Sequence, residues 1–323
     1  MPQLSLAHAV ARVRVLEGKL LHLEQIERLL QAPTLQEAYK LLEEYGYGPG
    51  SDYEAALRQA RQDLCAFLRE VSPNQRVTDA FLCKTDYQNA KLLLKGRMQG
   101  LDASGYAVDC GAVALKTLQE AVEEKEYHRL PKALAEALRE AETELNLHPE
   151  PGRIDLVLDA RWAKEAAELS KGCKTAQGYF VVLFDLTNLR SMLRAAKAGM
   201  DGRAAREQLL PGGEVDEDAL VACLGEPAKL LRLYEKQPYY RALQPAFEQA
   251  LQGGLYALEK LQDDVLLGML RQKRHETVAL EPLLGYFVAR EREMEMLRLV
   301  MAAKVNDFSQ EAVLERLREM YVE

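Results

Sequence analysis

The amino-acid sequence predicts an all-helical protein. Leu, Ala, Glu, Arg and Lys, which form helices readily, dominate the 323 residues, whereas aromatic residues make up 7%. Apolar residues recur at three- and four-residue steps over long stretches, as they do in amphipathic helices. One helical motif also occurs three times, at intervals of about a hundred residues. Together these observations predict three homologous helical domains.

The repeated motif is clearest in the segment KTDYQNAKLLLKGRMQG at 84–100. An acid is followed by Asn at the third step, a base at the fifth, apolar residues at the seventh and eighth, and a small residue at the tenth. The first copy consists of Asp86, Asn89, Lys91, Leu93, Leu94 and Gly96, and the second of Asp185, Asn188, Arg190, Met192, Leu193 and Ala195. The third copy, which has lost the Asn, consists of Glu293, Met296, Arg298, Val300, Met301 and Ala303.

Each copy predicts a helix with two different faces. At about 100° per residue, the acid, the Asn and the first apolar residue share one side, and the basic residues lie on the other. An acid and an amide on a buried face are costly unless they are hydrogen-bonded. We therefore expect an interdomain polar lock, in which these side chains bind donors of the adjacent unit. Its residues are Asp86, Asn89, Asp185, Asn188 and Glu293.

The chain is longer than one hydrophobic core usually organises, and a repeat of this length exceeds the common solenoid units of about 20 to 50 residues. The sequence therefore predicts three domains, at about 1–107, 108–212 and 213–323. The strongest linker signals are HPEPGR at 148–153 and LLPGGE at 209–214.

In chain order, apolar periodicity predicts one long helix over 5–31 and a second one that begins after Thr34 as its N-cap. GYGPGS at 46–51 predicts a turn, and the next helix starts at Asp52 and ends at Ser72-Pro73-Asn74. The first motif helix follows.

Other segments also repeat. GAVALKTL at 111–118 matches GEVDEDAL at 213–220 in its Gly, Val and Leu. Segments that contain Gln-Glu-Ala begin at 34, 117 and 308, so that the chain ends on the element that would open a further unit. This pattern predicts helices shared between neighbouring units. Chance similarity among Leu-, Ala- and Glu-rich helices is the alternative for these weaker repeats.

Composition and motifs argue against several classes of function. A net charge of −8 gives no basic footprint for nucleic acid. No apolar run reaches the roughly 20 residues of a membrane span, and Arg12 and Arg14 occupy the place of a signal peptide's apolar segment. Neither a phosphate-binding loop, nor a zinc-binding spacing of His and Cys, nor a G-x-S-x-G elbow occurs. We therefore expect a cytoplasmic non-enzyme without catalytic, cofactor-binding or metal-binding residues.

The basic faces of the motif helices have two interpretations. They are either solvated or, if three units surround a pseudo-threefold axis, they converge as a binding surface in an otherwise acidic protein. On the second interpretation the partner-binding residues are Lys91, Lys95, Arg190, Arg194, Lys197 and Arg298.

The sequence resembles the C subunit of the bacterial and archaeal V-type (A-type) rotary ATPases, whose eukaryotic relative is the d subunit. The resemblance covers essentially the whole chain. It is carried by AVARVRVLEGKLL at 9–21, by DYQNAKLLLKG and DLTNLRSMLRA in the first two motif copies, and by REREMEMLRLVMAAKVNDFSQEAVLERL at 290–317. The third copy departs from the pattern because it lacks the Asn.

The resemblance implies a funnel-like protein of three helical domains around a pseudo-threefold axis. It implies a rotor adaptor that joins the central stalk, made of the D and F subunits, to the cytoplasmic loops of the membrane proteolipid (c/K) ring. Such an adaptor transmits torque for ATP-coupled proton or sodium transport, as a monomer within a hetero-oligomeric complex peripheral to the membrane.

Two other functions remain open from the residues. A free-standing helical scaffold would bind other partners, and its gene would lie apart from genes for rotary subunits. An enzyme with an unfamiliar site would show a deep pocket with several convergent ionisable groups.

Overall fold

The computed structural model describes residues 5–48 and 52–322, and this part of the chain is helical, without a β-strand. The all-helical class is thus confirmed. The chain forms two compact units, one of Met1–Gln75 with Glu259–Glu323 (unit 1) and one of Arg76–Leu258 (unit 2). The three repeat boundaries remain a prediction, because a repeat is defined by duplicated elements and not by compactness.

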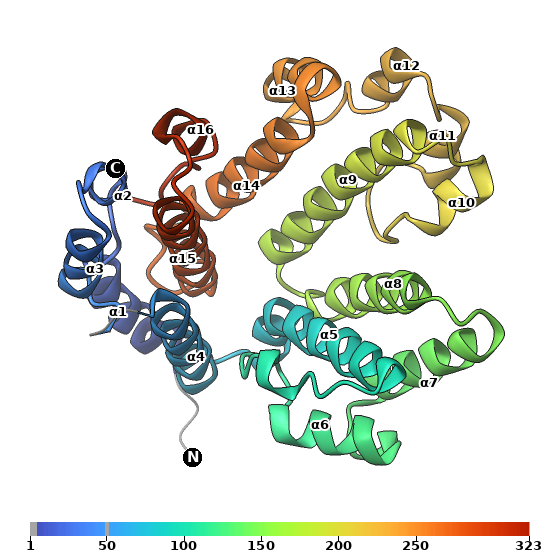
Figure 1. Cartoon of the computed structure of the whole chain (residues 1–323), viewed down its shortest axis with the longest axis horizontal. Helices are drawn as coiled ribbons and strands as arrows, with labels where there is room; N and C mark the ends of the chain where they lie inside the picture. Colours follow the sequence, from blue (N-terminus) through green and yellow to red (C-terminus); the bar gives the residue numbers. More distant parts are fainter. Residues whose placement is uncertain (1–4, 49–51, 323) are drawn as a thin grey trace. The chain divides into compact units, whose positions relative to one another are not determined.

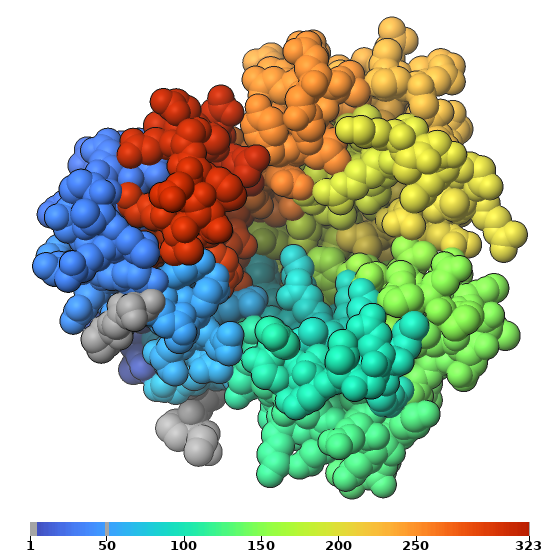
Figure 2. Space-filling view, in the orientation of Figure 1, coloured from blue at the N-terminus to red at the C-terminus, as the bar shows by residue number. Residues whose placement is uncertain are grey.

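Unit 1 is built around one long helix, α15 (Glu281–Val305), which is buried on nearly all sides. Such a helix forms the centre of a core because it has no face for solvent. Its neighbours come from both ends of the sequence, as the blue and red segments in Figures 1 and 2 show. They are α1 (Leu6–Glu17), α2 (Leu23–Gln31), α3 (Leu35–Glu44), α4 (Tyr53–Val71) and α16 (Gln310–Leu314).

The predicted single helix over 5–31 is wrong, because the structure breaks it into α1 and α2. Gly18 is the C-cap of α1, and His22 caps α2 through a capping box with Gln25. The connection between them buries Leu20 and Leu21. Apolar periodicity continues through this break, so the pattern alone could not show it.

The other expected boundaries in unit 1 are confirmed. The Thr34 hydroxyl accepts a hydrogen bond from the Glu37 amide at 3.2 Å, and the Asp52 carboxylate accepts one from the Ala55 amide at 3.0 Å. α4 ends at Val71, with Ser72 as its C-cap. In the expected turn, Gly46 and Gly48 have positive φ, while residues 49–51 lie outside the described part of the chain.

Unit 2 contains two further motif helices, α5 (Gln75–Gln99) and α9 (Lys174–Lys197). α8 (Pro151–Leu169) packs against α9 and against α7 (Lys132–Leu147), and Trp162 of α8 meets Phe184 of α9 edge-on, with ring centroids 5.6 Å apart (Figure 1). The remaining elements are η1 (Ser104–Tyr106), α6 (Leu115–Glu124), η2 (Tyr127–Arg129), α10 (Gly202–Glu207), α11 (Glu217–Ala222), α12 (Pro227–Arg232) and α13 (Tyr240–Gly253). α14 (Tyr256–Arg271) begins at the end of unit 2 and continues into unit 1.

The expected linker at 148–153 is shorter than predicted. Proline is favoured in the first turn of a helix because its missing N–H would have no helical partner there. Pro151 is accordingly the first residue of α8, and the connection between α7 and α8 consists of 148–150.

All three motif helices end in the same way. The fourteenth residue after the motif acid has a positive φ, and the amide of the next residue donates to the carbonyl of the small motif residue, which is the C-cap pattern of a Schellman turn. The positive φ values are 67° at Gly100, 66° at Gly199 and 53° at Asp307. The bonds run from Leu101 to Gly96, from Met200 to Ala195 and from Phe308 to Ala303, at 2.9 to 3.0 Å.

The residue after each turn accepts a hydrogen bond from an amide two or three residues later, and Asp201 and Ser309 are thereby the N-caps of the helices that follow them. Asp102 accepts from the Ser104 amide, Asp201 from the Ala204 amide and Ser309 from the Ala312 amide. α10 and α16 follow these two caps, whereas η1 begins after Ala103 at the corresponding place. The third copy therefore keeps the local fold of the other two, although its motif has diverged.

We expect the left-handed residue of these turns to control stability through the backbone alone. Gly199→Ala should cost about 1 kcal/mol, because an L-residue is strained there, although nothing lies within 4 Å of the added Cβ. Asp307→Gly should relieve strain and stabilise by a few tenths of a kcal/mol.

Urea unfolding measures both effects. Gly152→Ala is the control, because it adds the same methyl group to open space on ordinary helical backbone in α8 and should not destabilise. Equal effects of Gly199→Ala and Gly152→Ala would contradict the backbone explanation.

Candidate functional site

The first polar lock holds a loop against α5. Asp86 and Asn89 are buried, with 2% and 5% of their surface exposed. The Asp86 carboxylate accepts from the Ala112 amide at 2.8 Å and from the Val113 amide at 3.2 Å. Asn89 donates to the Val108 carbonyl at 2.8 Å and accepts from the Val108 amide at 3.0 Å. One helix face thus fixes the backbone between 108 and 113.

The second polar lock repeats this arrangement on α9. The Asp185 carboxylate accepts from the amides of Glu214 and Val215 at 2.9 and 3.0 Å. Asn188 donates to the Leu210 carbonyl at 2.9 Å and accepts from the Leu210 amide at 2.7 Å. Both motif side chains are 1% exposed. The pairing of an acid with two amides, and of an Asn with the amide and the carbonyl of one residue, is therefore a duplicated feature.

A glycine makes each of these two locks possible. A Cβ added at Gly111 would lie 1.7 Å from Oδ1 of Asp86, and one at Gly213 would lie 2.3 Å from Oδ1 of Asp185. No side chain fits between the loop and the carboxylate. This contact explains why GAVALKTL and GEVDEDAL share their glycine in register.

The third polar lock, on α15, uses different chemistry. Glu293 is fully buried and accepts from the Leu21 amide at 2.6 Å and from the Tyr47 hydroxyl, and it pairs with Arg290. Met296 stands where the other copies have Asn, and its sulfur accepts from the Arg318 amide at 3.4 Å. Because a thioether is a weak acceptor and cannot donate, it replaces only part of the Asn function.

The three acids bind equivalent amides. Val113, Val215 and Leu21 each immediately precede the N-cap residue of a helix, namely of α6, α11 and α2. At the position of the two glycines, unit 1 has Lys19. A glutamate is one methylene longer than an aspartate, so its carboxylate reaches a loop whose backbone lies farther from the helix. In the third lock, the N-terminal segment thus supplies the amide that binds the motif acid.

The electrostatics of the locks differ. Burial raises the pKa of Asp185 to about 6, although the hydrogen bonds from Val215 and Glu214 lower it. Its Oδ2 is buried without a hydrogen-bond partner among the described residues, and so is the Tyr239 hydroxyl. Burial also raises the pKa of Glu293, but Arg290, Tyr47 and the Leu21 amide oppose this effect. The carboxylate of Glu293 is thus compensated by a neighbouring cation, whereas that of Asp185 relies on main-chain amides.

Sequence reasoning missed Arg290 and Tyr47. Arg290 lies three residues before Glu293, a spacing that places two side chains together on a helix and could have indicated the pair. Tyr47 is far away in the sequence, and no local pattern marks it as a partner. Its ring also lies against the guanidinium, which is 4.9 Å from the ring centroid.

The basic residues of the motif helices are in several environments. Lys91 and Lys95 of α5 pair with Asp159 and Asp155 of α8. Arg298 pairs with Glu54 at 3.1 Å, and the half-buried Arg190 donates to the Thr187 hydroxyl at 3.4 Å. Arg194 and Lys197 are exposed on α9. Several of these cations thus make contacts within their own unit, and a role in partner binding stays a prediction.

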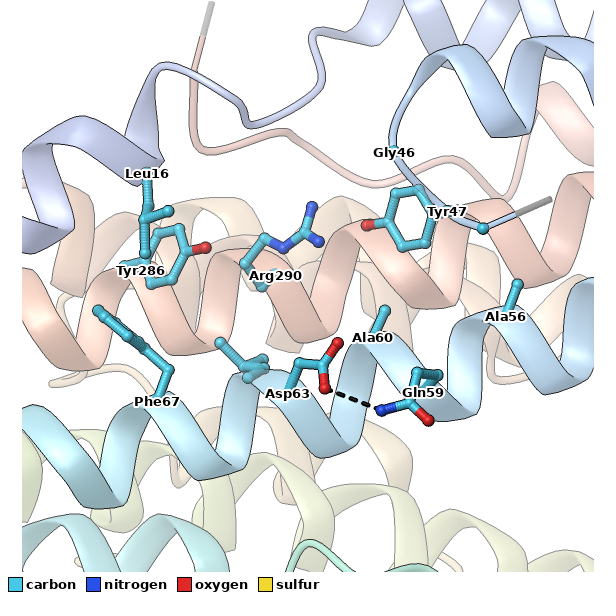
Figure 3. Close-up of a pocket in the computed structure, with 12 residues that line it drawn as sticks. Leu16, Gly46, Tyr47, Ala56, Gln59, Ala60, Asp63, Phe67, Tyr286 and Arg290 are labelled. Carbon is cyan, nitrogen blue, oxygen red and sulfur yellow. Dashed lines mark hydrogen bonds between the residues drawn. The ribbon is translucent and has the colours of Figure 1, made fainter.

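Unit 1 also has a pocket of about 490 Å³ between α4 and α15 (Figure 3). Phe67 and Tyr286 line it, and Arg290 projects between Tyr286 and Tyr47. Asp63 accepts from the Gln59 side chain at 2.8 Å, and Arg290 is bound to Glu293. The charged groups of this pocket are therefore already engaged, and Arg290 belongs to the third lock.

The described residues contain no group of three or more His, Cys, Asp or Glu side chains placed to hold a metal ion. None of their helices combines the length and apolar character that crossing a membrane requires.

This is a helical protein in which a motif helix occurs three times. Each copy has a buried acid bonded to the amide before an N-cap, and each ends in the same turn. The chain belongs to the ATP synthase (C/AC39) subunit family, whose sequence model matches residues 9–316. The expected resemblance is thus confirmed over nearly the whole chain.

Individual relatives agree with this membership. The chain is 24% identical to the C subunit of the V-type sodium ATPase of Enterococcus hirae, over 96% of this chain and 97% of that protein. It is 23% identical to the C subunit of the A-type ATP synthase of Methanocaldococcus jannaschii, over 95% and 84%, and 25% identical to that of Thermococcus gammatolerans, over 96% and 88%.

We expect Gly111→Ala to break the first lock. The added methyl group must push the loop away from Asp86, which leaves a buried carboxylate without its amides and costs about 3 kcal/mol. Thermal or urea unfolding measures the loss. Gly105→Ala is the control, because nothing lies within 4 Å of its Cβ, and it should be nearly neutral. Similar stabilities of the two variants would contradict the role of Gly111.

Asp185 should make stability depend on pH. Its pKa is about 6 in the folded chain and near 3.9 in an unfolded one, so its protonated form favours folding below pH 4, and this contribution is lost as pH rises through 6. Asp185→Asn removes the titration and should gain about 1–3 kcal/mol relative to the unsubstituted chain between pH 4 and 7. Urea unfolding of the variant and of the unsubstituted chain at pH 4 and pH 7 tests this expectation. An equal change in stability with pH in the two proteins would contradict it.

Proposed function

We propose that this chain is the non-catalytic adaptor of the rotor in a V-type ATPase or ATP synthase. It joins the D and F subunits of the central stalk to the membrane proteolipid ring and transmits torque for ATP-coupled proton or sodium transport. Membership of the ATP synthase (C/AC39) subunit family supports the class of complex. On this proposal the chain works in the cytoplasm, peripheral to the membrane.

The observation that carries the proposal is the threefold polar lock. A part that transmits torque must resist shear, and a buried side chain bonded to main-chain groups fixes a loop without relying on surface contacts. Asp86, Asp185 and Glu293 do so on three different helices. We propose that these locks join three domains, 1–107, 108–212 and 213–323, around a pseudo-threefold axis in a funnel-like protein.

We further propose that the stalk binds the basic faces of the motif helices. Arg194, Lys197 and Arg298 are exposed on this surface, and Lys91, Lys95 and Arg298 form ion pairs. Each of the two interfaces of an adaptor should bury on the order of 1,000 Å² or more.

Reversing two exposed charges of α9 tests the stalk surface. Arg194→Glu with Lys197→Glu should weaken binding to the purified D and F subcomplex about tenfold at low salt, because like charges then face each other. Calorimetry measures the affinity. Lys116→Glu with Lys132→Glu is the matched control, since it makes the same charge change at exposed residues of unit 2 outside the motif helices.

The outcomes separate the two parts of the proposal. Loss of binding only in the first variant supports the basic surface. Equal affinities of both variants and the unsubstituted chain would reject that surface. Failure of the unsubstituted chain to bind either the stalk or the ring would reject the adaptor function itself.

A further inference from the structure

A large apolar side chain is exposed at the same place in all three copies of the motif. It belongs to the residue that directly follows the positive-φ turn at the end of α5, α9 and α15. These residues are Leu101, Met200 and Phe308, which are 62%, 38% and 65% exposed. A hydrophobic residue at this position of a Schellman turn usually packs back onto its own helix. Here it extends into solvent three times.

Each of these residues has an exposed aspartate as its neighbour in the sequence, namely Asp102, Asp201 and Asp307. The C-terminal end of a helix adds partial negative charge from its free carbonyl groups. Hydrogen bonds from the Ser104 side chain and amide lower the pKa of Asp102, which keeps it ionised. We call the pairs Leu101 with Asp102, Met200 with Asp201, and Phe308 with Asp307 the apolar tips.

Two cations near the apolar tips are engaged elsewhere. Arg97 donates to the Val122 carbonyl and pairs with Glu142, and Lys304 donates to the Ala32 carbonyl at 2.6 Å. Other cations are exposed: Lys116 lines the same pocket as Leu101 and Asp102, and Lys197 and Arg203 flank the second tip. The charges that all three tips share are therefore an aspartate and the C-terminal end of a helix.

We propose that the three apolar tips dock on the cytoplasmic loops of the proteolipid ring, an inference that rests on the proposed function. An element that is kept in three copies suits a partner that presents the same surface many times. A ring of identical subunits does so, whereas a single shaft presents each of its residues once. The tips would insert apolar side chains between the loops.

Charge complementarity favours the same occupant. Short cytoplasmic loops of membrane proteins carry an excess of Lys and Arg. Basic loops complement the aspartates and helix ends at the tips, whereas the basic motif faces are left for the stalk.

Three weak contacts on one chain act together. Once one tip has bound, the others bind at a high effective concentration, so that the whole affinity exceeds that of any single tip. The loss of one tip should therefore have a small effect and the loss of all three a large one.

The test compares ring and stalk binding by the full chain. The triple variant Leu101→Ser, Met200→Ser and Phe308→Ser is measured against the purified ring in detergent and against the purified D and F subcomplex. We expect at least about tenfold weaker binding to the ring, unchanged binding to the stalk and unchanged thermal unfolding. Each single variant should lose about two- to threefold. Higher salt should weaken ring binding by the unsubstituted chain.

The control is Leu147→Ser, Leu251→Ser and Val278→Ser, which removes three equally exposed apolar side chains outside the tips. It should bind the ring like the unsubstituted chain. If the tip variant also binds the ring normally, or if it loses the stalk instead, the docking surface is wrong and the adaptor function stands. If the unsubstituted chain does not bind the ring, both are wrong.

Discussion

A buried carboxylate that accepts main-chain N–H groups is the interaction on which the rest of this structure depends. An ionised carboxylate removed from water is strongly destabilising unless it is fully hydrogen-bonded. Here the missing solvation is replaced by the amides of a loop, as at Asp86 with Ala112 and Val113. The helix can bury its polar face only when the loop is in place, and the loop is fixed only by that face. Helix and loop should therefore form together, which couples segments that are otherwise separate in sequence.

The sequence was sufficient to predict the buried side chains of this interaction. Periodicity and the cost of burying polar groups predicted that Asp86 and Asn89 are buried and hydrogen-bonded, and the structure shows both. The sequence was insufficient to predict their main-chain partners, because backbone amides recur along the chain and carry no sequence signature. The Leu21 amide lies 272 residues from Glu293, in the connection that interrupts a helix predicted as continuous by periodicity. Gly111 and Gly213 were visible as a repeat, but only the position of the carboxylate explains them.

The third copy shows what the lock requires and what it does not. Glu293 keeps the acid but reaches its amide with a longer side chain, so that Lys19 replaces a glycine. Met296 still accepts from a main-chain amide, although more weakly than Asn. Arg290 and Tyr47 add polar partners that offset the burial of Glu293. A buried acid bonded to the amide before an N-cap is thus the common requirement, and the accompanying amide side chain is replaceable.

The polar lock of each copy lies on a helix, and the apolar tip follows the turn that ends this helix. Fifteen residues separate Asp86 from Leu101, or about 22 Å at 1.5 Å per residue. Between them runs an α-helix closed by a Schellman turn, so its end is held by hydrogen bonds from Leu101 to Gly96. A force applied at the tip would pass along this helix to the lock and from there into the loop that precedes the next helix. Because main-chain hydrogen bonds to a buried carboxylate cannot be exchanged for water without exposing the charge, the lock resists sliding better than a surface ion pair would. An adaptor built in this way would transmit load through its backbone, and its surface charges would serve mainly to select its partners.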